Sequence, residues 1–142
     1  MIKKVLIAIT MLAHFSVDPH QVGPLRILLL LHHYQLNNKI MQAQLITYQL
    51  KDISQPEYLK QMVEPDAPIL AKVKGLISKV WLTNEEKNTY GGFYLWENKT
   101  AMEDFMHSEL VKAVVSRPFV KNVSSVDFEV NETASLITRG LK

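Results

Sequence analysis

The chain has 142 residues, which favours one globular domain large enough to bury a core without disulfides or metal ions. Hydrophobic residues make up 47% and charged residues 21%, which excludes wholesale disorder and a multi-pass membrane protein. The 16 basic residues barely outnumber the 14 acidic ones and form no stripe, so we expect no nucleic-acid partner. The absence of cysteine excludes thiolate zinc sites, iron–sulfur clusters and thiol nucleophiles.

The first forty residues differ from the rest of the chain. Lys3 and Lys4 precede the apolar run Val5 to Phe15, which has the length of a signal segment and is too short to cross a membrane. No clean cleavage site of small residues follows the run. We therefore predict a cytoplasmic protein without stable membrane association. Export is the alternative, if residues 1–15 act as a signal segment.

Met41 offers another explanation, because a compact domain can be built entirely between there and the C-terminus. We interpret residues 1–40 as an N-terminal extension, which is a leader, a signal-like segment or a mis-assigned start. Residues 41–142 are predicted to form the folded domain. The pair His32-His33 lies in the extension without a carboxylate at helical spacing, so we expect no metal site.

The predicted domain begins with a strand over Gln42–Leu50, which alternates and is rich in β-favouring residues. A helix follows, with Asp52 or Ser54 as its cap. Pro65 and Pro68 predict a kink or two short helices in this segment, which is expected to end at the next glycine.

Two further strands form a predicted hairpin. Leu76–Thr83 alternates, the polar loop Asn84–Thr89 follows, and Tyr90–Glu97 is rich in aromatic residues. A second helix starts at the capping box Thr100–Glu103, and Phe119–Val130 gives the last strand. The order β-α-β-β-α-β predicts a ferredoxin-like α+β fold.

The hairpin strands have two chemically different faces. The purely apolar face, predicted to lie under the helices, comprises Val80, Leu82, Phe93 and Leu95. The opposite face comprises Lys79, Trp81, Tyr94 and Trp96. Because monomers seldom leave such aromatic patches in water, we expect a second copy to cover it in a homodimer. The enclosed space is either a dimer core without ligand or a small-molecule pocket.

The pair Gly91-Gly92 interrupts the third strand. Its expected role is a bulge or a close approach of strands, in preference to contact with a ligand. No glycine-rich phosphate loop occurs in the sequence, so we do not expect nucleotide binding.

The same hairpin resembles a known family. The KVW strand at 79–81, the EKN loop at 86–88 and the GGFYL strand at 91–95 are similar to the hallmark of the YdhR-like monooxygenases. The segment 126–137 resembles the final strand and tail of that family, and the resemblance covers Met41 to Gly140. It implies a ferredoxin-like dimeric α/β barrel, related to antibiotic-biosynthesis monooxygenases that oxidise phenolic or quinone-like substrates with O₂ and without metal or flavin.

The resemblance implies a cofactor-independent monooxygenase that holds a small aromatic molecule between the sheet and helices of a homodimer, with O₂ as the second substrate. Lys79 would stabilise the substrate anion and Tyr94 would donate or relay a proton, so these two are the predicted catalytic residues. Trp81, Trp96 and Phe105 are the predicted substrate-binding residues. The alternative is that the aromatic side chains only pack, and that the lysine ammonium reaches water.

Two other functions stay open at this point. One is a non-catalytic dimer that binds a small ligand or serves a stress response. The other is haem degradation, which would need a histidine on the pocket face, and the strand residues of that face include none. His107 is the only histidine of the predicted domain, and we interpret it as a surface residue.

Overall fold

The computed structural model describes residues 23–37 and 39–141. The chain divides into two units at His33/Tyr34, and helix α2 (Pro24–Asn37) crosses this division. Among the described residues, no helix is long and apolar enough to cross a membrane. The signal-like run Val5–Phe15 lies outside the described residues, and the limits 1–40 and 41–142 stay a prediction.

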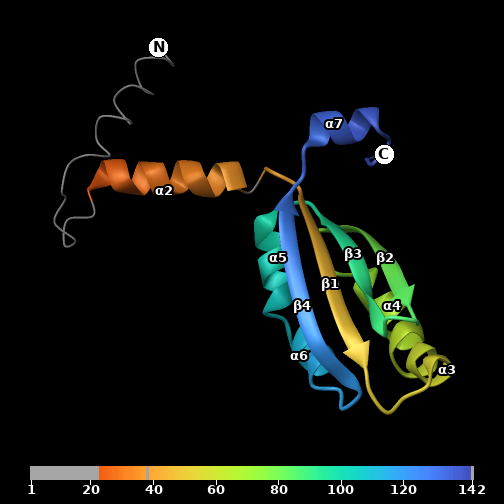
Figure 1. Cartoon of the computed structure of the whole chain (residues 1–142). Coiled ribbons are helices and arrows are strands. Elements are labelled where there is room, and N and C mark those ends of the chain that lie inside the picture. The colour runs from red at the N-terminus through yellow and green to blue at the C-terminus, as the bar shows by residue number, and fades with distance from the viewer. Residues whose placement is uncertain (1–22, 38, 142) are drawn as a thin grey trace. The chain divides into compact units, whose positions relative to one another are not determined.

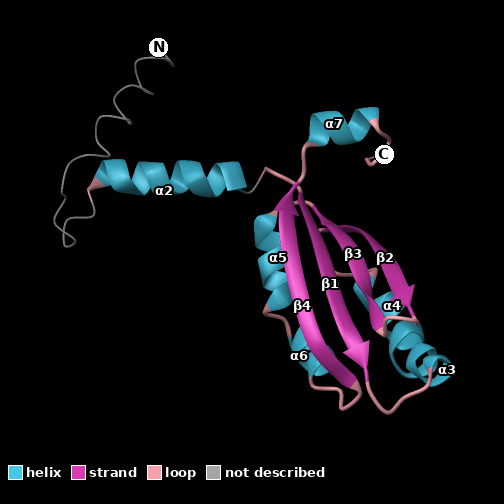
Figure 2. Ribbon diagram, in the orientation of Figure 1, coloured by secondary structure: helices cyan, strands magenta, loops and turns pink. Residues whose placement is uncertain are grey.

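The second unit holds an antiparallel sheet and short helices (Figure 1, Figure 2). The strands are β1 (Gln42–Leu50), β2 (Leu76–Asn84), β3 (Thr89–Trp96) and β4 (Val120–Glu129). The helices are α3 (Gln55–Tyr58), the π-helix η1 (Leu59–Val63), α4 (Glu64–Leu70), α5 (Lys99–Met106), α6 (Glu109–Val115) and α7 (Glu132–Ile137). The strand order β2-β3-β1-β4, with every pair antiparallel, confirms the predicted ferredoxin-like α+β fold.

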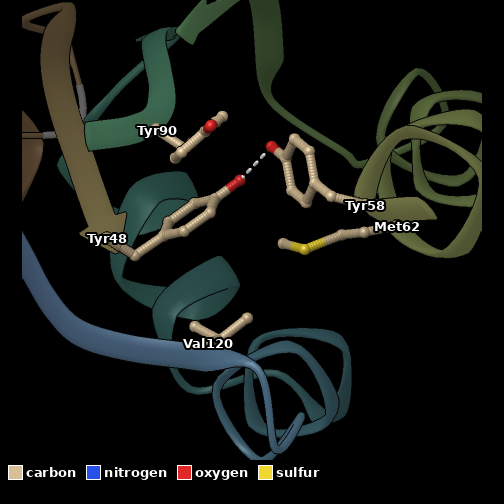
Figure 3. Close-up of a cluster of buried hydrophobic side chains, with 5 residues drawn as sticks. All are labelled: Tyr48, Tyr58, Met62, Tyr90 and Val120. Atoms are coloured by element: carbon tan, nitrogen blue, oxygen red, sulfur yellow. Dashed lines mark hydrogen bonds between the residues drawn. The ribbon is translucent and has the colours of Figure 1, made fainter. Parts of the chain in front are cut away.

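Helices α3 to α6 lie on the same face of the sheet (Figure 1). Two buried clusters join them to it. The first comprises Tyr48, Tyr58, Met62, Tyr90 and Val120 (Figure 3). The second comprises Leu70, Tyr94, Trp96, Met102 and Phe105. A cavity is lined by members of both clusters.

The first helical segment is continuous from Gln55 to Leu70, so the prolines do not divide it into separate helices. Ser54 caps it with a capping box, and Pro65 directly follows the start of α4, where the π-helix η1 passes into an α-helix. The segment ends at Leu70, earlier than the expected stop at Gly75.

The second predicted helix is split into α5 and α6. Asn98, and not Thr100, caps α5 by accepting a hydrogen bond from the backbone N–H of Ala101. Ser108 caps α6 in the same way through the N–H of Val111. A capping residue inside the predicted helix therefore begins a new helix. Its side chain accepts a hydrogen bond from a backbone N–H that a carbonyl of the preceding turn would pair in a continuous helix.

The predicted faces of the hairpin were wrong. Tyr94 and Trp96 are 6% and 0% exposed and pack under the helices, whereas Val80 and Phe93 are 54% and 40% exposed on the other face. Of the apolar set only Leu95 is buried. The rule that the most apolar face lies under the helices fails here because the covered face surrounds a cavity with polar groups.

Candidate functional site

A cavity of about 50 Å³ lies on the helix-covered side of the sheet. Its wall is aliphatic and aromatic, and the lining side chains with a charge or a hydroxyl group are Tyr48, Asp66, Lys79 and Tyr94. Strands β1, β2 and β3 and helix α4 each position one of these four. The arrangement is that of a small-molecule site, which is mostly apolar with a few convergent polar groups.

The cavity has the volume of only a few water molecules. An apolar cavity that admits benzene has about 150 Å³, so an aromatic ring enters this one only if lining side chains move. Met62 lines the cavity, and its unbranched thioether changes rotamer readily. Leu110 and Val111 of α6 form another part of the wall. Movement of these helical side chains would therefore enlarge the cavity.

Lys79 is the basic residue among those that line the cavity. Its Nζ lies 3.2 Å from the ring centroid of Trp81 and 4.6 Å from that of Tyr94. Within residues 23–37 and 39–141, Lys79 makes no ion pair and no side-chain hydrogen bond. Burial lowers the pKa of Lys79 to about 7, against a smaller opposing effect of the Asp66 charge. The amine can therefore exist in both protonation states near neutral pH.

The glycine pair makes room for this amine. A Cβ on Gly92 would lie 2.8 Å from Cε of Lys79 and 3.0 Å from Cε2 of Tyr94. A Cβ on Gly91 would overlap the carbonyl oxygen of Ile46, and its φ of +155° also favours glycine. The expected close approach of strands is thus confirmed for Gly91, whereas Gly92 leaves space for the lysine side chain.

The carboxylate of Asp66 is already paired. Both of its oxygens accept hydrogen bonds from the guanidinium of Arg117, at 2.8 and 2.9 Å. Asp66 is 3% exposed on α4, and Arg117 lies in the turn between α6 and β4, so the pair joins the two helical segments that cover the cavity. Its negative charge is compensated, which leaves the amine of Lys79 to respond to a ligand.

Two tyrosines share one hydrogen bond at the edge of the cavity. The hydroxyl oxygens of Tyr48 and Tyr58 are 2.6 Å apart (Figure 3). Burial raises the pKa of Tyr48, Tyr58 and Tyr94, so all three are neutral phenols. One hydroxyl of the pair donates to the other, and the acceptor keeps its own hydrogen for a further partner. Tyr48 lines the cavity and can direct that hydrogen toward a ligand.

The structure brings four of the five predicted site residues together, since Lys79, Trp81, Tyr94 and Phe105 all line the cavity. Trp96 is absent from the lining and lies behind the wall. Its indole is fully buried, stacks on Tyr94 at 5.9 Å between ring centroids, and donates a 3.0 Å hydrogen bond to Gln44.

Sequence reasoning missed Tyr48 and Asp66. Asp66 follows Met62 by four residues and precedes Leu70 by four, and such a place for a carboxylate in an apolar stripe indicates a buried acid. Tyr48 had no comparable signal, because a tyrosine in a strand is common.

His107 is exposed at the end of α5, with Nδ1 2.7 Å from the carbonyl oxygen of Glu103. The described residues contain no cluster of three or more His, Asp or Glu side chains able to hold a metal ion.

The fold and the cavity define a class of protein, a ferredoxin-like α+β domain with a cavity between its sheet and its helices. The model of the family described as "Putative mono-oxygenase ydhR" matches residues 45–141. The chain belongs to this family. Among curated proteins, none matches it in sequence.

Several solved structures share the fold. One is a protein of unknown function from Nitrosomonas europaea, 12% identical, with a TM-score of 0.54 over 66% of this chain and 92% of that chain. SnoaB, a cofactor-independent oxygenase from Streptomyces nogalater, is 15% identical, with a TM-score of 0.52 over 65% and 94%. MhuD, a haem degrader from Mycobacterium tuberculosis, is 17% identical, with a TM-score of 0.50 over 63% and 95%. At these identities the similarity shows the fold alone.

Proposed function

We propose that this protein is a cofactor-independent monooxygenase, which oxidises a small phenolic or quinone-like substrate with O₂ in the cavity between sheet and helices. The observation that carries the proposal is the amine of Lys79, held against Trp81 and Tyr94 in an apolar cavity of a chain that belongs to a monooxygenase family. The description of SnoaB as a cofactor-independent oxygenase supports it through a shared fold.

The amine supplies the acid–base chemistry. In its neutral form Lys79 accepts the proton of the substrate hydroxyl, and the resulting ammonium then stabilises the substrate anion. The anion transfers electrons to O₂. One oxygen atom becomes a carbonyl oxygen on a ring carbon, which loses its single hydrogen. The other oxygen atom leaves as water with that hydrogen and the hydroxyl proton that Lys79 accepted, and the product is a quinone. The aliphatic wall keeps bulk water away from the anion.

The two neutral phenols orient the substrate. Tyr94 lies beside the amine, and its O–H is kept protonated because burial raises its pKa. Tyr48 offers a second O–H from the opposite cluster. Trp81 and Phe105 present ring faces to an aromatic substrate, and Trp96 supports the Tyr94 ring from behind.

The proposal includes a homodimer, in which a second copy covers the open face of the sheet. Val80, Phe93, Leu45 and Val126 stand directly opposite one another across all four strands and form one exposed apolar row. Monomers rarely leave a patch of this kind in water, and a two-fold axis would place the row against itself. The tail helix α7, with Ile137 exposed, is proposed to pack on the partner.

Oxygen consumption tests the catalytic proposal. We expect the purified protein to accelerate O₂ uptake with at least one member of a panel of phenols and hydroquinones. Lys79→Met should lower the rate by at least tenfold, since removing an acid–base group typically costs about 10²–10⁴. Tyr94→Phe should lower it less, and Lys87→Met, in the exposed β2–β3 turn, should leave it unchanged.

The absence of uptake above the buffer rate with every compound would overturn the oxygenase proposal. The alternative function, a non-catalytic small-ligand-binding or stress-related dimer, predicts saturable binding of the same compounds without O₂ consumption. Haem degradation has no support from the site, because His107 is exposed and does not line the cavity.

The cytoplasmic location belongs to the same proposal, with export as its alternative. Mass spectrometry of the native N-terminus tests it. A mature chain that begins after the run Val5–Phe15 would favour export, and one that retains the run would favour the cytoplasm.

A further inference from the structure

We propose that the cavity has a second activity: Lys79 binds small uncharged aldehydes covalently, as an imine. This goes beyond the oxygenation proposed above, because it needs neither O₂ nor a phenol. Three features carry it. The amine has no carboxylate or hydrogen-bond partner among the described residues, it is held against the Trp81 ring, and two neutral hydroxyl groups line the same cavity. Each is a property of the described residues.

The amine is isolated from hydrogen-bond acceptors and carboxylates, and its close contacts are the ring faces of Trp81 and Tyr94. Lys79 has no hydrogen-bond acceptor and no carboxylate partner in the described part of the chain, and Asp66 is engaged by Arg117 on both oxygens. Isolation in an apolar wall is what makes a lysine nucleophilic. The low pKa of Lys79, about 7, agrees with this geometry, and leaves about half of the amine neutral at pH 7.

The position of the amine is fixed on one side. The Trp81 ring lies 3.2 Å from Nζ, and the Lys79 stem occupies space that a side chain on Gly92 would enter, since a Cβ there would lie 2.8 Å from Cε. Lys79 lines the cavity, from which a carbonyl carbon would approach Nζ. A preset position of this kind removes much of the entropic cost of bringing two reactants together.

The covalent step is balanced without an oxidant or a cofactor. The lone pair of the neutral amine attacks the carbonyl carbon, a C–N bond forms, and a proton moves from nitrogen to oxygen to give a carbinolamine. Its C–O bond then breaks, one water molecule leaves, and a C=N bond remains. The departing oxygen leaves as water with the remaining hydrogen of the nitrogen, and the neutral hydroxyls of Tyr94 and Tyr48, which line the cavity, can donate hydrogen bonds to it.

The cavity also selects the class of aldehyde. A cavity of about 50 Å³, a third of the roughly 150 Å³ that admits benzene, favours short aliphatic aldehydes such as propanal over aromatic ones. Asp66 is engaged by Arg117 and leaves no carboxylate free for a cationic substituent, and the amine of Lys79 is used in the imine. The ligand class is therefore a small, uncharged, apolar aldehyde.

Reductive trapping tests the proposal. The full chain is incubated anaerobically with propanal and sodium cyanoborohydride at pH 7, and peptide mass spectrometry follows each lysine over time. We expect Lys79 to be alkylated at least tenfold faster than the exposed Lys87 and Lys121 of the same molecule. Lys79→Arg should lack the fast adduct, and Lys87→Arg should keep it.

Two results would overturn the proposal: alkylation of Lys79 no faster than that of the exposed lysines, or alkylation of Lys79 only after unfolding in urea. The comparison among lysines of one wild-type molecule does not depend on the folding of any variant. Because O₂ is excluded, the outcome is also independent of the oxygenase test.

Discussion

A lysine amine placed against two aromatic rings and away from carboxylates is costly to keep charged. The ring faces of Trp81 and Tyr94 favour the ammonium, but burial opposes it more strongly and lowers the pKa of Lys79 to about 7. The sequence placed Lys79 and Tyr94 on one face, because alternation fixes side-chain direction along a strand. It could not show that Gly92 makes the space for the amine, since that depends on the pairing of β2 with β3.

The charge of Lys79 makes stability depend on pH. Between about pH 7 and 10.5 the unfolded chain keeps a proton on Lys79 that the folded chain releases, so this residue makes stability rise with pH across that window. We expect Lys79→Met to raise the free energy of unfolding at pH 7 by about 2–5 kcal/mol, at about 1.4 kcal/mol per pKa unit. The gain should shrink toward pH 10.5.

Urea unfolding of wild type and Lys79→Met at several pH values measures this difference. Lys121→Met, at an exposed position, is the control and should give no pH-dependent gain. An equal gain in the free energy of unfolding at pH 7 and pH 10 would show that burial of the Lys79 charge does not destabilise the folded protein.

At the scale of elements, a π-helical turn keeps four side chains on one face. Tyr58, Met62, Asp66 and Leu70 are spaced by four residues, and all four are buried. An α-helix repeats every 3.6 residues, so a strict spacing of four would drift around it, and the wider turn of η1 compensates. The apolar pattern predicted the helix, whereas the π turn has no local sequence signal. The split between α5 and α6 was missed because Ser108 was not recognised as a cap.

The ion pair between Asp66 and Arg117 holds α4 against the turn that follows α6. We expect Arg117→Met to lower the free energy of unfolding by about 3–5 kcal/mol, because it leaves a buried carboxylate without a partner. The double variant Asp66→Leu with Arg117→Met should recover most of the loss.

Chemical denaturation of the two variants measures these changes. Lys112→Met removes the exposed pair with Glu109 and should change stability by less than about 1 kcal/mol. An equal loss of stability in the single and double variants would show that Arg117 does not act by compensating the charge of Asp66.

At the scale of the molecule, strand positions and their order were predictable and the burial of the faces was not. Alternation placed β1 at Gln42–Leu50, and the turn residues separated β2 from β3, which together give the ferredoxin-like order. Either face of the sheet could lie under the helices, and the hydrophobicity of the side chains alone predicted the wrong face. The apolar row that contains Phe93 is exposed in one chain. In the proposed dimer a second copy covers this row, and a pattern within one sequence does not distinguish such a face from one covered by helices.

The open face makes the oligomeric state testable. We expect the purified protein to be a dimer, and Phe93→Glu to convert it to a monomer, because a carboxylate at the centre of the apolar row would be buried without a partner. Ile69→Glu is the matched control, since Ile69 is about equally exposed on α4, outside that row.

Light scattering coupled to size-exclusion chromatography measures both variants. A wild-type monomer, or dissociation by Ile69→Glu and not by Phe93→Glu, would exclude the open face as the interface.

Incorporation of ¹⁸O from ¹⁸O₂ tests the central claim most directly, with whichever phenol or hydroquinone supports O₂ uptake. We expect one labelled oxygen atom in each product molecule, one O₂ consumed per product, and a rate at least tenfold lower for Lys79→Met. An unlabelled product, or one hydrogen peroxide released for every O₂ consumed, would contradict the assignment of the cavity as a monooxygenase site.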